Sequence, residues 1–231
     1  MPTVLITGAN RGLGLEFCRQ YAESGWNVIA CCRQPQAAAA LQELAARHPS
    51  LRPEPLDVAD FRRIDAIAAG LAGSAIDVLL CNAAIYGDEP GRGVGAIDYE
   101  HWSEALRVNA QAPVKLVEAF LPHLSRGERK LVVAVTSLMG SMADNRRGGS
   151  ILYRSSKAAL HAAMVSLSID LKPQGIGVII VHPGWVRTDM GGPQAPMEAA
   201  ESIRGMRAVI EGFRPEQSGR FLNYRGQVQP W

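Results

Sequence analysis

The sequence predicts an α/β protein with a parallel, doubly wound sheet of about seven strands and helices on both faces. Short apolar runs alternate six times with amphipathic helical segments before a last short strand, which is typical of parallel strands joined by crossover helices. A glycine-rich turn separates the first apolar run from the first helical segment. With 231 residues, the chain has the length of one large domain, which we expect to span residues 1–231.

The composition limits the classes of function. Apolar residues make up 47% of the chain and charged residues 20%, and the net charge is +2, so nucleic acid is not indicated as a partner. Because no apolar run reaches the roughly 20 residues of a membrane span and no apolar leader precedes the first strand, we expect a cytoplasmic protein without membrane contact. The cysteines and histidines have no metal-ligand spacing. We therefore expect buried free thiols and no metal site.

The first strand, expected at residues 4–8, leads into a turn that contains Gly8, Gly12 and Gly14. Apolar residues then recur at helical spacing. Glycine permits positive φ and close approach to the backbone, so a diphosphate can lie against this turn and the amides of the helix N-terminus. A tight structural turn is the alternative. The position between the first strand and the first helix favours dinucleotide binding.

The second strand, expected at 27–32, bears on the choice of dinucleotide. Dinucleotide-binding folds often place an acidic residue about 20 positions after the glycine turn, where it binds the ribose hydroxyls. Here Cys32 stands near that position and Arg33 follows it. No carboxylate repels a ribose 2′-phosphate, and Arg33 and Arg11 can pair with one, so we expect NADP(H) to be preferred over NAD(H). A solvated arginine at a strand end is the alternative.

The next segments continue the alternation, with a helix at 37–46, a strand at 52–58, a helix at 64–71 and a strand at 76–81. Asp57 lies at the end of the third strand. It can accept a hydrogen bond from an adenine amino group or cap the helix that begins near Asp60, and the spacing does not distinguish these roles. The fourth strand ends in Asn82, Ala83 and Ala84, small residues that let a cofactor approach the backbone.

A glycine-rich loop at 86–97 precedes a long helix expected at 99–124, and we expect the loop to border the active site. Asn109 is a polar residue on the apolar stripe of this helix. Pro113 removes the amide that would bond the carbonyl of residue 109, so we expect a kink and a free carbonyl there. Asn109 can therefore anchor a water or a lysine, or it can be satisfied locally.

Ser137 ends the fifth strand, which is expected at 130–137. The carboxyl ends of parallel strands are where open α/β sheets bind ligands, so the Ser137 hydroxyl can donate to a substrate carbonyl oxygen. Ser141 is a competing candidate. The polar loop at 144–150 follows, and we expect it to shape the substrate pocket.

Tyr153 and Lys157 stand four residues apart in a helix expected at 151–171, so both side chains leave the same face. A lysine there favours the phenolate and lowers the tyrosine pKa from its usual value of about 10. The phenol then becomes a proton donor or acceptor nearer neutral pH. Alone, such a pair also occurs by chance on surface helices. Small residues on this helix suit close packing between subunits.

The sixth strand, expected at 177–181, is followed by Pro183 and Gly184, a turn that shapes the wall of a pocket. We expect a small substrate-loop region around 185–215, in which residues 191–196 form a candidate lid before a helix at 197–212. A last short strand is expected at 219–224.

Taken in order, these motifs resemble the short-chain dehydrogenase/reductase family, single-domain type, over essentially the whole chain. The matching positions are Gly8, Gly12 and Gly14, Asp57, Asn82 and Ala83, Asn109, Ser137, Tyr153 and Lys157, and Pro183, Gly184 and Thr188. Within the family, the run 11–16, the segment 182–193 and the Pro-Trp end resemble C-factor-like or Sniffer-like carbonyl reductases. Two features differ from the usual pattern: Ala84 stands where glycine is common, and the interval from Ser137 to Tyr153 is a few residues longer.

The resemblance implies a Rossmann-type fold and an NADPH-dependent reduction of an aldehyde, ketone or quinone, or the reverse reaction. Tyr153 would give a proton to the carbonyl oxygen, Lys157 would lower the tyrosine pKa and hold the nicotinamide ribose, and Ser137 would orient the carbonyl. Asn109 would hold a water that links Lys157 to solvent. A dinucleotide-binding regulatory or signalling protein is the alternative. From the small residues of the helix that begins at Ile151 we expect a homodimer or homotetramer.

The resemblance further assigns cofactor contacts along the chain. Arg11 and Arg33 would face the 2′-phosphate, Asp57 the adenine and Thr188 the carboxamide. The expected cofactor-binding residues are Gly8, Asn10, Arg11, Gly12, Leu13, Arg33, Asp57, Val58, Asn82, Ala83, Ala84, Tyr153, Lys157, Pro183, Gly184, Val186 and Thr188.

Overall fold

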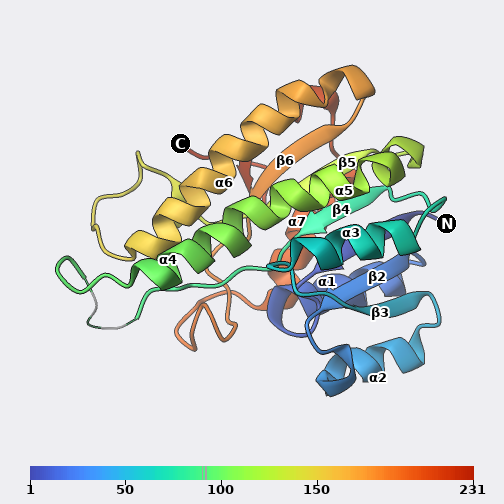
Figure 1. The fold of residues 1–231 in the computed structure, drawn as a ribbon, viewed down its shortest axis with the longest axis horizontal. Helices are drawn as coiled ribbons and strands as arrows, with labels where there is room; N and C mark the ends of the chain where they lie inside the picture. The colour runs from blue at the N-terminus through green and yellow to red at the C-terminus, as the bar shows by residue number, and fades with distance from the viewer. Residues whose placement is uncertain (90, 92) are drawn as a thin grey trace.

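A seven-stranded parallel sheet forms the centre of the protein (Figure 1), as the computed structural model shows for residues 1–89, 91 and 93–231. The strand order is β3-β2-β1-β4-β5-β6-β7, and every neighbouring pair is parallel. The order reverses direction beside β1, which is the point where doubly wound sheets bind nucleotides. The predicted fold class is confirmed.

The predicted strands and helices are present, with bounds that differ by a few residues. The strands are β1 (Thr3–Thr7), β2 (Asn27–Cys32), β3 (Leu51–Pro55), β4 (Val78–Cys81), β5 (Leu131–Val135), β6 (Gly177–His182) and β7 (Phe221–Asn223). The helices are α1 (Gly12–Glu23), α2 (Ala39–Arg47), α3 (Phe61–Gly70), α4 (Tyr99–Leu106), α5 (Ala112–Arg126), α6 (Ile151–Asp170) and α7 (Ala199–Glu211).

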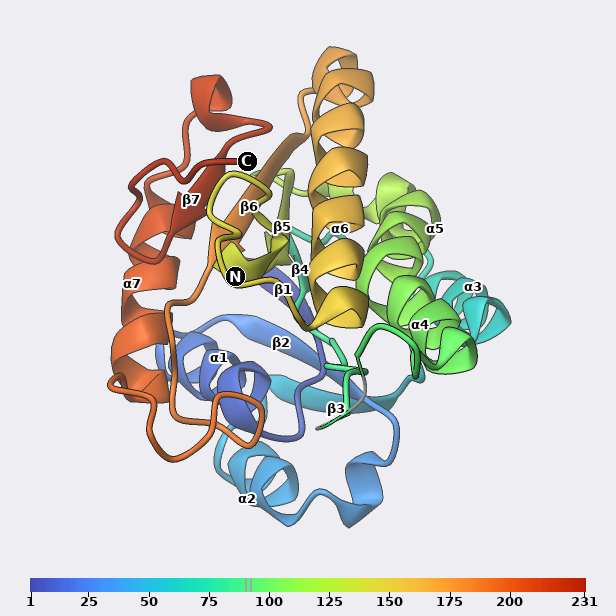
Figure 2. The ribbon, with the colours of Figure 1, turned by 90° about the vertical axis from the view of Figure 1, so that its left-hand side faces the viewer.

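The helices cover the two faces of the sheet in separate layers. Helices α1, α2 and α7 lie on one face, and α3 to α6 lie on the other (Figure 2). Alternate residues of each strand point to opposite layers: Leu5 belongs to the cluster under α3, α5 and α6, whereas Val4 and Ile6 belong to the cluster under α1 and α7. Because both faces are buried, the strands are apolar throughout.

The helix expected at 99–124 is interrupted by a π-helical segment, Arg107–Gln111, between α4 and α5. Pro113 lies in the first turn of α5, so its missing amide falls where the α-helical bonding pattern changes. The predicted irregularity is therefore present as a wide turn, a feature often found at functional sites. Asn109 lies in the middle of this segment and is fully buried.

All four cysteines lie in described parts of the chain and are buried and unpaired, which confirms that prediction. Burial raises the pKa of the Cys81 thiol to about 12, so this side chain stays a protonated, unreactive group. Within the residues that the structure describes, no helix has the length and apolar character needed to cross a membrane.

Gly14 in the first turn of α1 tests how tightly the glycine turn is packed. A Cβ at Gly14 would lie 2.0 Å from the carbonyl oxygen of Gly8, so Gly14→Ala should force the backbone apart and lower the free energy of unfolding by about 1–3 kcal/mol. Gly70→Ala is the control, because no atom lies within 4 Å of the added methyl there. The control should be neutral or slightly stabilising. Urea denaturation of both variants measures the difference, and equal midpoints would contradict the tight packing.

Candidate active site

The glycine turn between β1 and α1 forms a close-packed cradle. Gly8 and Gly12 adopt φ of +68° and +53°, a region that residues with a side chain rarely enter. A Cβ on Gly8 would lie 2.9 Å from the Cα of Ala83. The turn thus brings its own backbone and the end of β4 together without intervening side chains.

The N-terminus of α1 suits an anionic ligand. Arg11 is its N-cap residue and has extended backbone angles, and among the described residues no side chain caps the first amides. The first turn also contains no acidic residue, so the positive end of the helix dipole is not neutralised there. A Cβ on Gly12 would meet the Cγ2 of Thr188 at 3.5 Å, so Thr188 lies across from the turn. This cradle fits the diphosphate of a dinucleotide.

Asn82 has a structural role that sequence analysis did not predict. Its Nδ2 donates to the carbonyl oxygens of Thr7 and Gly8 at 2.9 and 3.3 Å. The Thr7 hydroxyl accepts from the backbone amides of Asn82 and Ala83, both at 3.1 Å. Thr7 and Asn82 therefore join the end of β4 to the glycine turn. Neither the types of these two residues nor their separation in the sequence predicts these hydrogen bonds.

The two arginines proposed for a 2′-phosphate lie in different settings. Arg33 is exposed just after β2, next to the buried Cys32. Arg11 forms an ion pair with Asp189 from the segment after β6. Both side chains of this pair are largely exposed, so the pair is weak and Arg11 can exchange partners.

Asp57 does not cap the following helix. Its Oδ1 accepts from the amide of Ala59 at 2.9 Å, whereas Asp60 caps α3 by accepting from the amide of Arg63 at 3.1 Å. The capping alternative for Asp57 is wrong because Asp60 stands at the N-cap position itself. Asp57 is exposed at the carboxyl edge of the sheet, and Val58 beside it is buried in the core.

The remaining cofactor positions follow β1, β4 and β6. Asn10 is exposed on the glycine turn, and Leu13 and Ala84 are partly buried. After β6, Gly184 adopts a φ of +86° and Pro183 accepts a hydrogen bond at 2.7 Å from the Ser202 hydroxyl. Val186 is buried. The turn predicted there is therefore anchored to α7.

Asn109 is held by three hydrogen bonds in the π-helical segment. Its Oδ1 accepts from the amide of Ile85 at 2.9 Å, and its Nδ2 donates to the carbonyl of Ile85 at 2.8 Å and to the Ser156 hydroxyl at 2.9 Å. The side chain thus joins the loop after β4 to α6. This corresponds to the local alternative for Asn109, and its backbone carbonyl stays a candidate water anchor.

Tyr153 and Lys157 lie side by side at the start of α6, as the spacing predicted. Both are buried, and the Lys157 Nζ is 5.7 Å from the centre of the Tyr153 ring. Lys157 also donates to the carbonyl of Val135, the last residue of β5, at 3.1 Å. Ser137 follows that strand, and its side chain lowers the pKa of the Tyr153 phenol. The sheet edge therefore brings Ser137, Tyr153 and Lys157 together.

The pKa of Tyr153 differs from the sequence prediction. Burial raises it to about 12, although the Ser137 side chain lowers it. Burial also lowers the pKa of Lys157 to about 8. The lysine was expected to lower the tyrosine pKa, but desolvation is the largest cause of both shifts, and the ammonium donates to the Val135 carbonyl. The phenol thus keeps its proton at neutral pH.

Ser141, the competing serine, has a different role. It is buried, and its hydroxyl accepts from the amide of Asp144 at 3.0 Å, so it stabilises the loop after β5. Ser137 caps the short 3₁₀ turn Leu138–Gly140 by accepting from the amide of Met139 at 3.1 Å. Of these two serines, Ser137 is the one that affects the pKa of Tyr153.

A buried histidine behind the site was not predicted. The His161 Nε2 lies 2.7 Å from the hydroxyl of Thr136, and its ring packs on Trp231 with centroids 5.6 Å apart. Burial, with the nearby charges of Lys157 and His182, lowers the pKa of His161 to about 4. The sequence feature that could have indicated this position is the spacing: His161 follows Lys157 by four residues, so both lie on the same face of α6.

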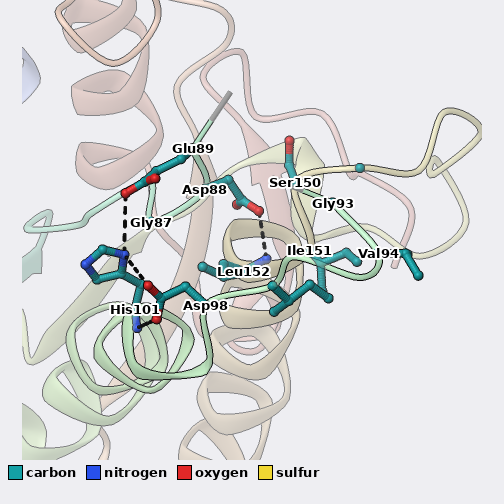
Figure 3. Close-up of a pocket in the computed structure, with 12 residues that line it drawn as sticks. Gly87, Asp88, Glu89, Gly93, Val94, Asp98, His101, Ser150, Ile151 and Leu152 are labelled. Carbon is teal, nitrogen blue, oxygen red and sulfur yellow. Dashed lines mark hydrogen bonds and ion pairs between the residues drawn. The ribbon is translucent and has the colours of Figure 1, made fainter. Parts of the chain in front are cut away.

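The loop after β4 contacts the candidate catalytic tyrosine directly. The rings of Tyr86 and Tyr153 lie 4.9 Å apart between centroids, and the Asp88 carboxylate accepts from the Tyr153 amide at 2.8 Å. Figure 3 shows Asp88 at the wall of a pocket of about 230 Å³. This pocket lies beside the start of α6, and its lining does not include Tyr153. Pro90 and Arg92 of the predicted loop lie outside the described residues.

Comparison with known proteins agrees with this geometry. A dinucleotide cradle with Asn, Ser, Tyr and Lys near one sheet edge defines a nucleotide-dependent oxidoreductase. The profile of the short chain dehydrogenase family matches residues 2–199, and the chain belongs to this family. It is 45% identical over 166 residues to the C-signal protein of Myxococcus xanthus, covering 72% of this chain and 99% of that protein.

Further relatives match over the full length. The chain is 33% identical over 238 residues to the 1-hydroxy-2-glutathionyl-2-methyl-3-butene dehydrogenase of a Rhodococcus species, covering 100% of both chains. The carbonyl reductase Sniffer of D. melanogaster superposes with a TM-score of 0.93 at 32% identity over 100% of both chains. An NADPH-bound carbonyl reductase from chicken fatty liver gives a TM-score of 0.93 at 35% identity, over 100% of this chain and 99% of that one.

The depressed pKa of His161 predicts acid destabilisation. From pH 6.5 to about 4, the unfolded chain binds a proton at this residue that the folded chain does not, so the free energy of unfolding falls as the pH falls. The contribution is complete above pH 6.5. His161→Gln should flatten this dependence by roughly 2–3 kcal/mol, whereas His48→Gln on the partly exposed end of α2 should leave it unchanged. Urea titrations between pH 4 and 7 measure both slopes, and parallel slopes in all three proteins would contradict the assignment.

Proposed function

We propose that the protein is an NADPH-dependent carbonyl reductase in which Tyr153 protonates the carbonyl oxygen of the substrate. The observation that supports this most is the contact of Ser137 and Lys157 with Tyr153 at the carboxyl edge of a dinucleotide-binding sheet. The structural relatives include carbonyl reductases, one of them with NADPH bound. The proposed substrates are aldehydes, ketones or quinones.

The residues of the site divide the work of proton transfer. Bound NADPH would supply a hydride to the carbonyl carbon. The Ser137 hydroxyl is placed to orient the carbonyl oxygen, and Tyr153 is placed to give it a proton. With a pKa of about 12, the phenol is fully protonated at neutral pH, which favours reduction over removal of a proton from an alcohol. Lys157, whose pKa is about 8, stays mostly charged and stabilises the phenolate that is left.

The cradle supports a specific placement of the cofactor. The exposed amides at the start of α1 would hold the diphosphate, and Thr188, which lies across from them, would contact the carboxamide of the nicotinamide. Arg33 at the end of β2 would pair with the 2′-phosphate, and Arg11 would do so by leaving Asp189. No carboxylate follows β2 directly, so NADP(H) is the preferred cofactor in this proposal.

A dinucleotide-binding signalling protein is the second candidate. The 45% identity to the C-signal protein supports it, because that relative is named for a signal. The buried tyrosine and lysine favour the enzyme, since burial of two polar groups costs stability that a cofactor sensor has no reason to bear. Tight NADPH binding without turnover of any carbonyl would favour the signalling protein.

Replacing the tyrosine tests the chemistry. Tyr153→Phe removes the proton donor, so kcat for NADPH-dependent reduction should fall by about 100-fold or more while NADPH still binds. The control is Tyr99→Phe, which changes an exposed tyrosine on α4. NADPH oxidation with a panel of aldehydes, ketones and quinones measures kcat, and fluorescence titration measures cofactor affinity. Full activity in the Tyr153→Phe protein would exclude the proposed mechanism.

Replacing Arg33 tests the choice of cofactor. Arg33→Ser removes one charged partner of the 2′-phosphate, so the Kd for NADPH should rise about 10- to 100-fold while the Kd for NADH stays within twofold. Arg47→Ser, at the exposed end of α2, should change neither value. Titration of each protein with both cofactors gives the comparison. Equal weakening of NADPH and NADH by Arg33→Ser would show that this arginine does not select the 2′-phosphate.

A further inference from the structure

The segment 85–88, which follows β4, is fixed at its first residue to the helices beside the active site. Both backbone groups of Ile85 bond the Asn109 side chain, at 2.8 and 2.9 Å. The same side chain donates to Ser156 on α6 at 2.9 Å. Asn109 is fully buried, so these bonds are shielded from water and hold Ile85 firmly.

The other end of this segment caps α6. The Asp88 carboxylate accepts from the backbone amides of Leu152 at 3.2 Å and Tyr153 at 2.8 Å, and Figure 3 shows it pointing at the Leu152 nitrogen. Ser150 holds the N-cap position but adopts a left-handed φ of +47°, and it makes no side-chain cap bond in the described structure. Asp88, more than 60 positions earlier in the chain, therefore caps α6 in place of the N-cap residue.

The residues between these two anchors contact Tyr153 and its neighbours. The Tyr86 ring packs against the Tyr153 ring, and its hydroxyl lies 2.8 Å from the hydroxyl of Ser150. Gly87 adopts a φ of +77°, and a Cβ there would lie 3.3 Å from the Cβ of Ala105 and 3.6 Å from that of Leu152. The segment cannot shift without moving the ring or the backbone of Tyr153.

From these contacts we propose that Asp88 is a positioning residue for Tyr153, acting through the helix amides and assisted by the ring of Tyr86. This inference rests on the proposed function. The carboxylate bonds the backbone amides of α6. It fixes where α6 begins, and Tyr153 is only the third residue of that helix, where a helix without a cap frays.

The position of the cap links the loop to the chemistry. A local cap from Ser150 would hold the helix start whatever the loop did, but Ser150 makes no such bond in the described structure. With Asp88 as the cap, the loop after β4 must be in place for the Tyr153 backbone to be fixed. Proton transfer depends on placing the phenol within a fraction of an ångström, so a small displacement reduces kcat more than it reduces cofactor binding.

The test compares caps on two neighbouring helices. Asp88→Ala removes both acceptors from α6, and Asp88→Asn keeps one oxygen that can still accept. Asp98→Ala is the matched control, because Asp98 accepts from the amides of Glu100 and His101 at 3.0 Å each and caps α4, which carries no candidate catalytic residue. Each variant is assayed for kcat, for KM, for the NADPH Kd and for hydrogen exchange of the backbone amides at 150–157.

Asp88→Ala should lower kcat about 10- to 100-fold, leave the NADPH Kd within twofold, and speed exchange of the Leu152 and Tyr153 amides. Asp88→Asn should recover most of kcat. Asp98→Ala should keep kcat within twofold and leave exchange at 150–157 unchanged. Equal kcat in Asp88→Ala and Asp98→Ala, or a loss confined to the NADPH Kd, would overturn the proposal.

The exchange measurement separates this inference from the proposed function. If the native protein reduces no carbonyl, the proposed function fails, but faster amide exchange in Asp88→Ala would still support control of the Tyr153 backbone by Asp88. If the native protein is active and exchange at these amides is the same in Asp88→Ala, the positioning role of Asp88 fails while the enzyme assignment stands.

Discussion

The close backbone contact between the glycine turn and the end of β4 is the constraint on which the rest of the site depends. Gly8 approaches Ala83 so closely that a single added carbon would collide, and Thr7 and Asn82 lock the contact with four hydrogen bonds. This contact determines where β1 ends, where α1 presents its amides and where the loop after β4 begins. The same contact therefore positions both the cradle and the loop that reaches Tyr153.

Burial governs the chemistry of the paired side chains. Tyr153 and Lys157 have lost most of their water, so desolvation moves their pKa values in opposite directions, to about 12 and about 8. Both shifts favour uncharged forms. A site of this kind holds a proton on the phenol until a substrate oxygen develops negative charge beside it, and Ser137 is already placed to share that hydrogen bond.

Local patterns predicted the fold and the residues at the sheet edge, but they did not predict contacts between distant segments. The strand β2 was predicted with its observed bounds because Gly25 marks the end of the helix before it and Arg33 follows its last apolar residue. Asp57 stayed ambiguous because its spacing fitted two roles, and the structure assigns the cap to Asp60. Asn82 was assigned to the cofactor, yet its side chain bonds the glycine turn. Asp88 was not predicted, because the sequence around a loop carboxylate does not indicate which distant helix it caps.

The wide π-helical turn at Arg107–Gln111 also affects the register of the helices around it. A π turn contains more residues than an α turn, so the faces of α4 and α5 are out of phase by about 100°, the rotation that one residue contributes in an α-helix. On the α4 side of this turn Trp102 donates to Ser155, and within the turn Asn109 donates to Ser156, the next residue of α6. The extra residue of this turn, rather than a change of side chain, is what turns the face of α5 relative to that of α4.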